Sequence, residues 1–310
     1  SQTLIVVPID GSENSLRSLD YINLMFGSNH HLKVTVFHVL PSLPSVLIEE
    51  GRKNAKIGEQ LQNLKKKDIE LAERLLTVAK NKLVKLGFSE QAVETVYKER
   101  RVGIARDICN WAQDNRADAL IISSRGRTRI EAFFTGEIAN KVLEYTKTCP
   151  IWMVKGSVKN RDVFLAVDHS ENALRAVNHC GFMLSGAGAN VMVFHANRDL
   201  RSFIPKEVVE EFPEFNKFFS RKAGAVVAPY LKKSKEMLLK AGLTERRVEI
   251  KVIDGSRNTA RDILDKAHSD GIGTVVLGKR GSSNVKDFSM GSIARKVLDG
   301  AMDMAICMVP

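Results

Sequence analysis

Residues 10–17 of this chain read DGSENSLR, and residues 168–175 read DHSENALR. A second block, ARDI, stands at Ala105–Ile108 and returns unchanged at Ala260–Ile263. The two blocks keep their order and nearly keep their spacing, which is the mark of an internal repeat rather than of chance matches. We therefore interpret the chain as a duplication of one domain.

The repeat divides the 310 residues into two predicted domains, residues 1–157 and 158–310. Each half is long enough to bury a hydrophobic core of its own. Within each half, apolar runs such as Thr3–Ile9 alternate with segments of helical periodicity. The runs are continuously apolar, which is typical of strands in a parallel sheet covered on both faces. The sequence thus predicts the α/β class, with two tandem doubly wound domains that carry helices on both faces of a parallel sheet. Pro8 cannot donate to a sheet, so we expect it at the carboxyl end of its strand.

The loop that follows the fourth apolar run of the second half has the chemistry of a phosphate site. In a doubly wound sheet, ligands bind beyond the carboxyl ends of the strands. Gly278 and Gly281 allow the backbone to approach a ligand closely. Gly291 and Ser292 stand at the expected start of a helix, where amide groups and the helix dipole favour an anion. These four residues predict a polyphosphate site.

The spacing Gly278-x2-Gly281-x9-Gly291-Ser292 resembles the nucleotide loop of universal stress proteins, and the segments at 7–12 and 166–170 resemble that family's first strand and turn. The resemblance covers essentially the whole chain as two family domains in tandem. It implies a five-stranded parallel sheet in each domain and, for members that bind ATP, a regulatory role. It also implies a nucleotide site made of Asp168 by the adenosine, Ala196 beside the adenine, and Leu277, Gly278, Gly281, Gly291, Ser292 and Ile293 around the ribose and phosphates.

The first half departs from this loop pattern. Ser123 stands at the position of the first glycine, and Glu137 stands where the second half has its serine. A carboxylate there would repel a phosphate, and it is also placed to cap its own helix. Arg125, Arg127 and Arg129 are open to three interpretations: they neutralise Glu137, stay solvated, or recruit a different anion. We expect nucleotide in the second half only, and the ligand of the first half stays undetermined.

Three functions fit these motifs. The leading hypothesis is a cytosolic stress-response regulator that binds ATP or a related adenine nucleotide. The second is a slow ATPase or phosphotransferase that uses the same loop, with Ser292, Lys279, Asp287 and His169 as neighbours of the phosphates. The third is an interaction module that binds no nucleotide. The sequence shows no catalytic constellation, so no catalytic residue is assigned and a binding protein is favoured over an enzyme.

Composition limits the cofactors and the compartment. The seven histidines do not cluster at ligand spacing, so no metal site is predicted, although magnesium would be a natural companion of the nucleotide. Four scattered cysteines suit reduced thiols in the cytoplasm. No apolar run is long enough for a membrane span. The net charge of +11 is dispersed and only 6% of residues are aromatic, which argues against nucleic acid.

Partner contacts are predicted in two places. The last strands, Ile151–Val154 and Ile306–Val309, are short and apolar, and the family resemblance implies that such strands form dimer contacts. We therefore expect the two halves to pair within the chain, while a homodimer stays open. The segments 41–86 and 199–243 differ between the halves, and the second is rich in phenylalanine. They cover the sheet, cover the ligand cleft or recruit an unknown protein partner.

Overall fold

The computed structural model describes residues 2–27, 31–124, 136–281 and 290–310, in two compact units. One unit comprises residues 1–23 and 30–149, and the other comprises residues 24–29 and 150–310. Each unit alternates strands and helices around a mainly parallel sheet, which confirms the predicted fold class. Within the described ranges, no helix is both long enough and apolar enough to cross a membrane.

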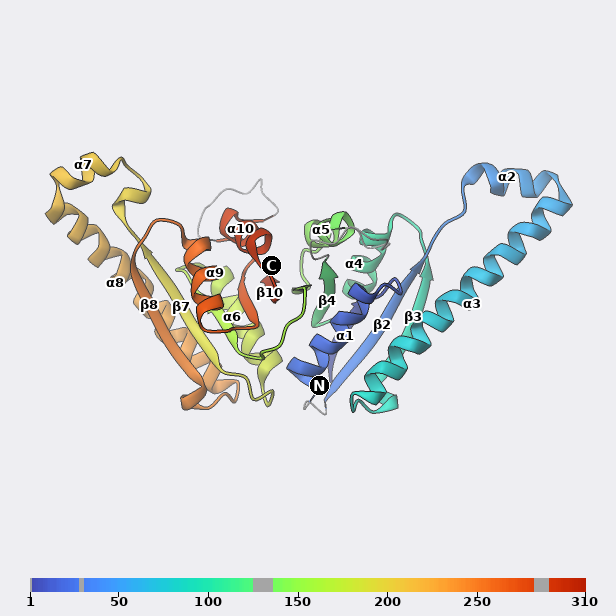
Figure 1. The fold of residues 1–310 in the computed structure, drawn as a ribbon, viewed down its shortest axis with the longest axis horizontal. Coiled ribbons are helices and arrows are strands. Elements are labelled where there is room, and N and C mark those ends of the chain that lie inside the picture. The colour runs from blue at the N-terminus through green and yellow to red at the C-terminus, as the bar shows by residue number, and fades with distance from the viewer. Residues whose placement is uncertain (1, 28–30, 125–135, 282–289) are drawn as a thin grey trace. The chain divides into compact units, whose positions relative to one another are not determined.

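The first unit contains a parallel sheet in which β1 pairs with β2 and β4, and β2 pairs with β3. The longest helix, α3, lies along β2 and β3 (Figure 1). As predicted, β1 ends at Pro8. The elements are β1 (Thr3–Pro8), α1 (Glu13–Phe26), β2 (Leu32–Leu40), α2 (Ser45–Lys53), α3 (Ala55–Lys85), the 3-10 turn η1 (Glu90–Ala92), β3 (Val93–Glu99), α4 (Ile104–Asp114), β4 (Ala119–Ser124) and α5 (Gly136–Tyr145).

The second unit contains a sheet with the strand order β5-β10-β9-β6-β7-β8. All its pairs are parallel except β5 with β10, which run antiparallel. The two strands that close the repeats therefore pair with each other, as the sequence predicts, and β5 belongs to the second unit. The strands are β5 (Ile151–Lys155), β6 (Val163–Ala166), β7 (Val191–Arg198), β8 (Val248–Ser256), β9 (Thr274–Gly278) and β10 (Met304–Val309).

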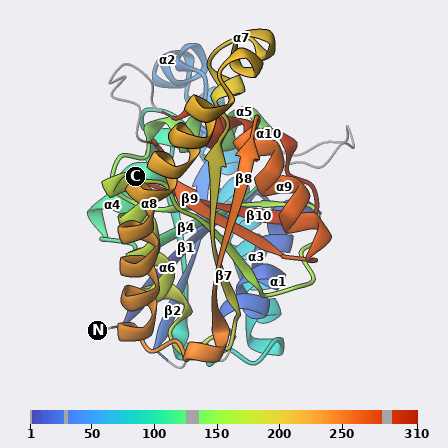
Figure 2. The ribbon, with the colours of Figure 1, turned by 90° about the vertical axis from the view of Figure 1, so that its left-hand side faces the viewer.

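Helices cover both faces of this second sheet. The strands β7 and β8 lie between α6 and α8 on one side and α9 and α10 on the other (Figure 2). Ser170 caps α6, because its Oγ accepts a hydrogen bond from the Ala173 amide at 3.1 Å. The helices are α6 (Glu171–Leu184), α7 (Lys206–Glu211), α8 (Pro213–Lys240), α9 (Thr259–Ser269) and α10 (Ser292–Gly300), with 3-10 turns η2 (Leu200–Ser202) and η3 (Glu245–Arg247).

A buried indole–imidazole pair lies in the core of the second unit. Trp152 of β5 is fully buried, and its Nε1 donates a hydrogen bond to Nε2 of His179 at 3.0 Å. Phe26 packs edge-on against the same indole, with ring centroids 5.5 Å apart. Because Nε2 of His179 accepts this hydrogen bond, the imidazole must be unprotonated at that atom. Burial accordingly lowers the pKa of His179 from 6.5 to about 4.

Acid should destabilise the second unit through His179. The folded protein keeps this ring neutral, while the unfolded chain binds a proton below its ordinary pKa of 6.5. The stability is therefore complete above that pH and falls as the pH drops towards the folded pKa, by up to about 3 kcal/mol. Urea unfolding followed by Trp152 fluorescence, in a Trp111→Phe background that leaves Trp152 as the only tryptophan, measures the loss between about pH 7 and pH 4.5.

The control for this measurement is His179→Gln, whose side-chain oxygen still accepts from the indole but does not titrate. Its stability should fall by clearly less over the same pH interval. An equal fall in both proteins would show that other groups cause the acid sensitivity.

Candidate functional site

The second unit contains a cavity of about 610 Å³ at the carboxyl ends of β6, β7 and β9. The first turns of α6 and α10 close one end of it, and side chains from α8 line the other. Its position agrees with the rule for ligand sites in doubly wound sheets. All eight residues singled out in the sequence line it, namely Asp168, Ala196, Leu277, Gly278, Gly281, Gly291, Ser292 and Ile293.

Asp168 organises the turn that leads from β6 into α6. Its Oδ1 accepts hydrogen bonds from the amide of Ser170, at 2.9 Å, and from the Ser170 hydroxyl. Its Oδ2 faces Gly281, since a Cβ built on that glycine would lie 3.3 Å from this oxygen. Asp10 of the first unit makes the same turn with Ser12, at 2.9 Å. The turn is thus a structural property of both repeats. For the site, the relevant feature is that Oδ2 of Asp168 faces Gly281.

The described glycines of the loop bring backbone segments into close contact. The amide of Gly291 donates a hydrogen bond to the carbonyl oxygen of Lys279 at 2.8 Å. A Cβ on Gly291 would lie 3.3 Å from the amide nitrogen of Gly281, and one on Gly278 would lie 3.0 Å from the Arg280 carbonyl oxygen. These positions tolerate a side chain poorly, because the neighbouring atoms are backbone. The glycines therefore let two amide-rich segments converge beside the cavity.

The N-terminus of α10 points its amide groups into this region. Gly291 is the N-cap residue, and as a glycine it has no side chain to cap the helix. The first-turn amides of Ser292 and Ile293 have no partner inside the helix and are suited to an anion. Arg280 also lines the cavity, whereas Lys279 is buried and does not line it. Asp287, one of the expected neighbours of the phosphates, lies outside the described residues.

The opposite end of the cavity is apolar and comes largely from the segment 199–243. Two of its phenylalanines, Phe203 and Phe219, line the cavity, and their rings meet edge-on with centroids 5.7 Å apart. The Arg198 guanidinium lies 4.2 Å from the centroid of Phe203. The remaining phenylalanines of the segment are exposed and do not line the cavity, namely Phe212, Phe215 and Phe218. The segment therefore covers part of the cleft, one of the alternatives left open by its sequence.

Two polar residues of the cavity, His195 and Asn197, were missed in the sequence. The Nδ1 of His195 donates to the Val167 carbonyl oxygen at 2.7 Å, and His38 does the same to Ile9 at 2.8 Å in the first unit. The triplet Val-Phe-His occurs before the end of both second strands, at 36–38 and 193–195, and would have revealed the pair. Burial lowers the pKa of His195, which favours its neutral form.

Comparison with known proteins identifies the family. A profile of the universal stress protein family matches residues 3–155 and again residues 159–302. The chain belongs to the universal stress protein family. Its two matched stretches also confirm the predicted tandem arrangement.

Solved universal stress proteins share the fold of this chain. The protein from Archaeoglobus fulgidus DSM 4304 gives a TM-score of 0.63 at 17% identity, with coverage of 99% of this chain and 97% of that one. A putative universal stress protein from Pseudomonas aeruginosa UCBPP-PA14 gives 0.55 at 14% identity, with coverage of 100% and 93%. At such identities the likeness concerns the fold alone. Comparison with curated protein sequences gives no match.

The first universal stress protein domain is built differently at the corresponding place. Ser123, at the position of the first loop glycine, is buried and shares a hydrogen bond with Ser18 of α1 at 2.6 Å. A Cβ on Gly11, in the turn after β1, would lie 2.5 Å from Leu75 of α3. A leucine of the long helix thus packs directly onto the turn that, in the second domain, borders the cavity.

Glu137 lies in the first turn of α5, where its predicted role as a helix cap stays a prediction. In the described residues, its carboxylate binds the Lys141 ammonium one turn further on, at 2.5 Å. This hydrogen bond lowers the pKa of Glu137, although both side chains are largely solvated. The pairing at i and i+4 is the favourable order of charges on a helix. Arg125, Arg127 and Arg129, for which three interpretations were open, lie outside the described residues.

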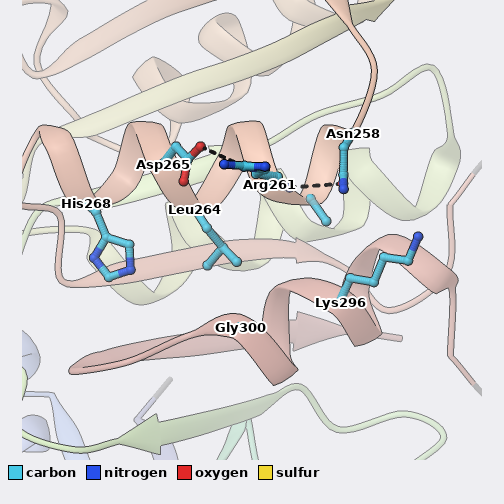
Figure 3. Close-up of a pocket in the computed structure, with 8 residues that line it drawn as sticks. Asn258, Arg261, Leu264, Asp265, His268, Lys296 and Gly300 are labelled. Carbon is cyan, nitrogen blue, oxygen red and sulfur yellow. Dashed lines mark hydrogen bonds and ion pairs between the residues drawn. The ribbon is translucent and has the colours of Figure 1, made fainter. Parts of the chain in front are cut away.

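A second, shallower cavity of about 380 Å³ lies between α9 and α10 (Figure 3). Arg261 and Asp265 form an ion pair there at 3.4 Å, with His268 and Lys296 nearby. The two paired side chains are 77% and 68% exposed, so their interaction contributes little. None of the eight predicted residues lines this groove.

Proposed function

We propose that the second universal stress protein domain binds ATP or a related adenine nucleotide, and that binding regulates a partner in a cytosolic stress response. The observation that carries this proposal is the cavity itself. It joins a helix N-terminus with glycine at the N-cap to an apolar compartment lined by α8. Its volume of about 610 Å³ lies in the range of small-molecule and cofactor sites.

The polar end has the properties that a polyphosphate requires. Amide groups at the start of α10 provide hydrogen-bond donors, and the helix dipole adds partial positive charge. Gly281 and Gly291 leave room where a Cβ would meet Asp168 or the backbone. Arg280 contributes a full positive charge to the same end. Asp168, at the border of the two ends, is placed to accept a hydrogen bond from a ribose hydroxyl.

Magnesium would enter this site with the nucleotide. Among the described residues, no three histidine, cysteine, aspartate or glutamate side chains are grouped to hold a metal ion. Magnesium commonly keeps several waters and relies on phosphate oxygens as ligands. In this proposal the phosphate oxygens and water therefore provide most of the magnesium ligands.

The proposed compartment rests on the cysteines. All four are buried in the structure, which suits thiols that stay reduced in the cytosol. Burial raises the pKa of Cys149 and Cys180 to about 12, so neither is a reactive thiolate.

Calorimetric titration of the purified full chain with ATP tests the proposal. We expect one molecule bound per chain, because the complete glycine spacing of the loop occurs only in the second half of the sequence. Acid extraction of the protein as purified, followed by ion exchange, would show whether adenine nucleotide is carried along. The absence of both ATP binding and extracted nucleotide would refute the proposal. Two bound molecules per chain would refute the expectation that only the second domain binds nucleotide.

Phosphate release distinguishes a binding protein from a slow ATPase. A regulator that only binds ATP should release no phosphate above the background of the buffer. Steady release that disappears in Ser292→Ala would assign the site to an enzyme instead, since this hydroxyl lies at the phosphate end.

A further inference from the structure

The pairing between β7 and β8 is interrupted at the edge of the cavity. Ala196 faces Ile253, but Arg198 faces Ser256, so β8 carries one residue more than β7 across this step. Gly255 supplies the extra length in a left-handed conformation, with φ of +75°. The corresponding pair of the first domain, β2 and β3, continues in unbroken register. Bulges of this kind re-aim side chains and are frequent beside functional sites.

The bulge brings a carboxylate to the side chain of Asn197. Asp254 precedes Gly255 in the bulge, and its Oδ1 accepts a hydrogen bond from Nδ2 of Asn197 at 2.8 Å. A carboxylate oxygen accepts and does not donate, so this contact fixes which end of the amide is nitrogen. The first domain has Leu40 at the position of Asn197 in the repeated strand. The asparagine and its partner are therefore a specific addition of the second domain.

The other end of the amide has no partner in the described part of the chain. Asn197 lines the cavity and is 5% exposed, and its Oδ1 is buried without a hydrogen bond. The side chain lies near His195, where it opposes the lowering of that residue's pKa by burial, but among the described residues no contact of Oδ1 meets the distance and angle of a hydrogen bond. A buried acceptor without a hydrogen bond costs folding free energy, so a ligand that donates a hydrogen bond to this oxygen would gain affinity from it.

The surroundings of Asn197 indicate which part of a ligand would carry that donor. Phe219, Val226 and Val227 of α8 line the same end of the cavity, together with Ala196. An aromatic base suits these apolar walls, whereas the amide-rich end near Gly281 suits phosphates. A base that reaches this compartment would present its exocyclic group to the amide oxygen of Asn197.

We propose that Asn197 is the residue that determines base specificity, because its Oδ1 accepts a hydrogen bond from the exocyclic amino group of an aminopurine. The inference rests on the proposed function, since it requires a nucleotide in this cavity. A 6-oxopurine carries a carbonyl oxygen in place of the amino group and would leave two acceptors facing each other. Sites built around a polar contact of this kind reject the analogue that lacks the matching group.

The test compares ATP with inosine triphosphate, in which an oxygen replaces the amino group of the base. Calorimetry on the full-length protein should show ATP binding at least about tenfold more tightly. In Asn197→Leu, which introduces the residue of the first domain, the preference should fall to about twofold or less because the acceptor is absent. Asn197→Ala serves as a second variant should the leucine disturb folding.

The matched control is Asn216→Leu. Asn216 of α8 also has a buried side-chain oxygen that finds no partner among the residues the structure describes, but it does not line the cavity. The preference for ATP over inosine triphosphate should be unchanged in this variant.

The possible outcomes separate the two proposals. Equal affinity of the natural protein for ATP and inosine triphosphate would overturn the role of Asn197 and leave the nucleotide site in place. A preference that persists in both Asn197 variants would do the same. Weak binding of 2′-deoxyATP together with equal binding of ATP and inosine triphosphate would assign Oδ1 to a ribose hydroxyl and also overturn it. Failure of every nucleotide to bind would overturn the proposed function as well.

Discussion

Gly291→Glu is expected to weaken ATP binding by at least about 100-fold. The new carboxylate would stand at the N-cap of α10, where the proposal places the phosphates. Two unit charges about 4 Å apart repel by about 4 kcal/mol at an effective dielectric constant of about 20, which exceeds that factor. The side chain would also compete for the first-turn amides of Ser292 and Ile293. Calorimetry or displacement of a fluorescent ATP analogue measures the loss.

The repeat provides a matched control for this substitution. Gly136 stands at the corresponding position of the first domain, at the start of α5. Gly136→Glu introduces the same charge into the same chain, and we expect it to leave ATP affinity within about twofold, since that domain is not the proposed site. Equal losses in the two variants would show that the effect is general and that the site is wrongly placed.

Gly273→Ala is expected to destabilise the second domain by about 3 kcal/mol or more. Gly273 precedes β9, and a Cβ there would lie 1.8 Å from the carbonyl oxygen of Asn160. The neighbour is backbone, so no rotamer change can relieve the overlap and a strand or the connecting segment must shift. Urea unfolding in the Trp111→Phe background, with Trp152 as reporter, measures the change in the domain concerned.

Gly103→Ala is the control for the glycine substitution. Gly103 has an extended backbone with φ of 164°, and a Cβ there meets no atom within 4 Å. Alanine caps α4 somewhat less well than glycine, so we expect a loss below about 1 kcal/mol. If Gly273→Ala proved equally mild, the close approach of Asn160 would have to relax at little cost.

Much of the fold is legible in the sequence because the physical signals are strong. Continuous apolar runs are hard to place anywhere except in a covered parallel sheet, and the run at Thr3–Ile9 corresponds to β1. Helix boundaries were less well determined. The segment 41–86 contains two helices, α2 and α3, which Asn54 divides. Asn54 ends α2 and caps α3 with its own side chain, a local choice that apolar periodicity does not report.

The candidate site was predictable where glycine was required. Gly278, Gly281 and Gly291 stand where the structure leaves little room for a Cβ, so their spacing carries geometric information. Asn197 gave no such signal, because its importance depends on a bulge in β8, a strand distant in sequence. The ion pair between Glu137 and Lys141 was also not predicted, since a helix surface offers a carboxylate both its own N-terminus and a lysine one turn later. Choices between local partners of similar energy are decided by details of geometry that a sequence pattern does not contain.

Because β5 pairs with β10, cutting the chain between its repeats would separate two strands of one sheet. A fragment beginning at residue 158 would lack β5 and expose one side of β10, whose six residues are all buried here. An apolar edge strand with unpaired amides is a template for another chain, so such a fragment would be prone to associate or aggregate. A strand encoded by the first repeat thus completes the sheet of the second unit, so the second repeat depends on the first for its fold.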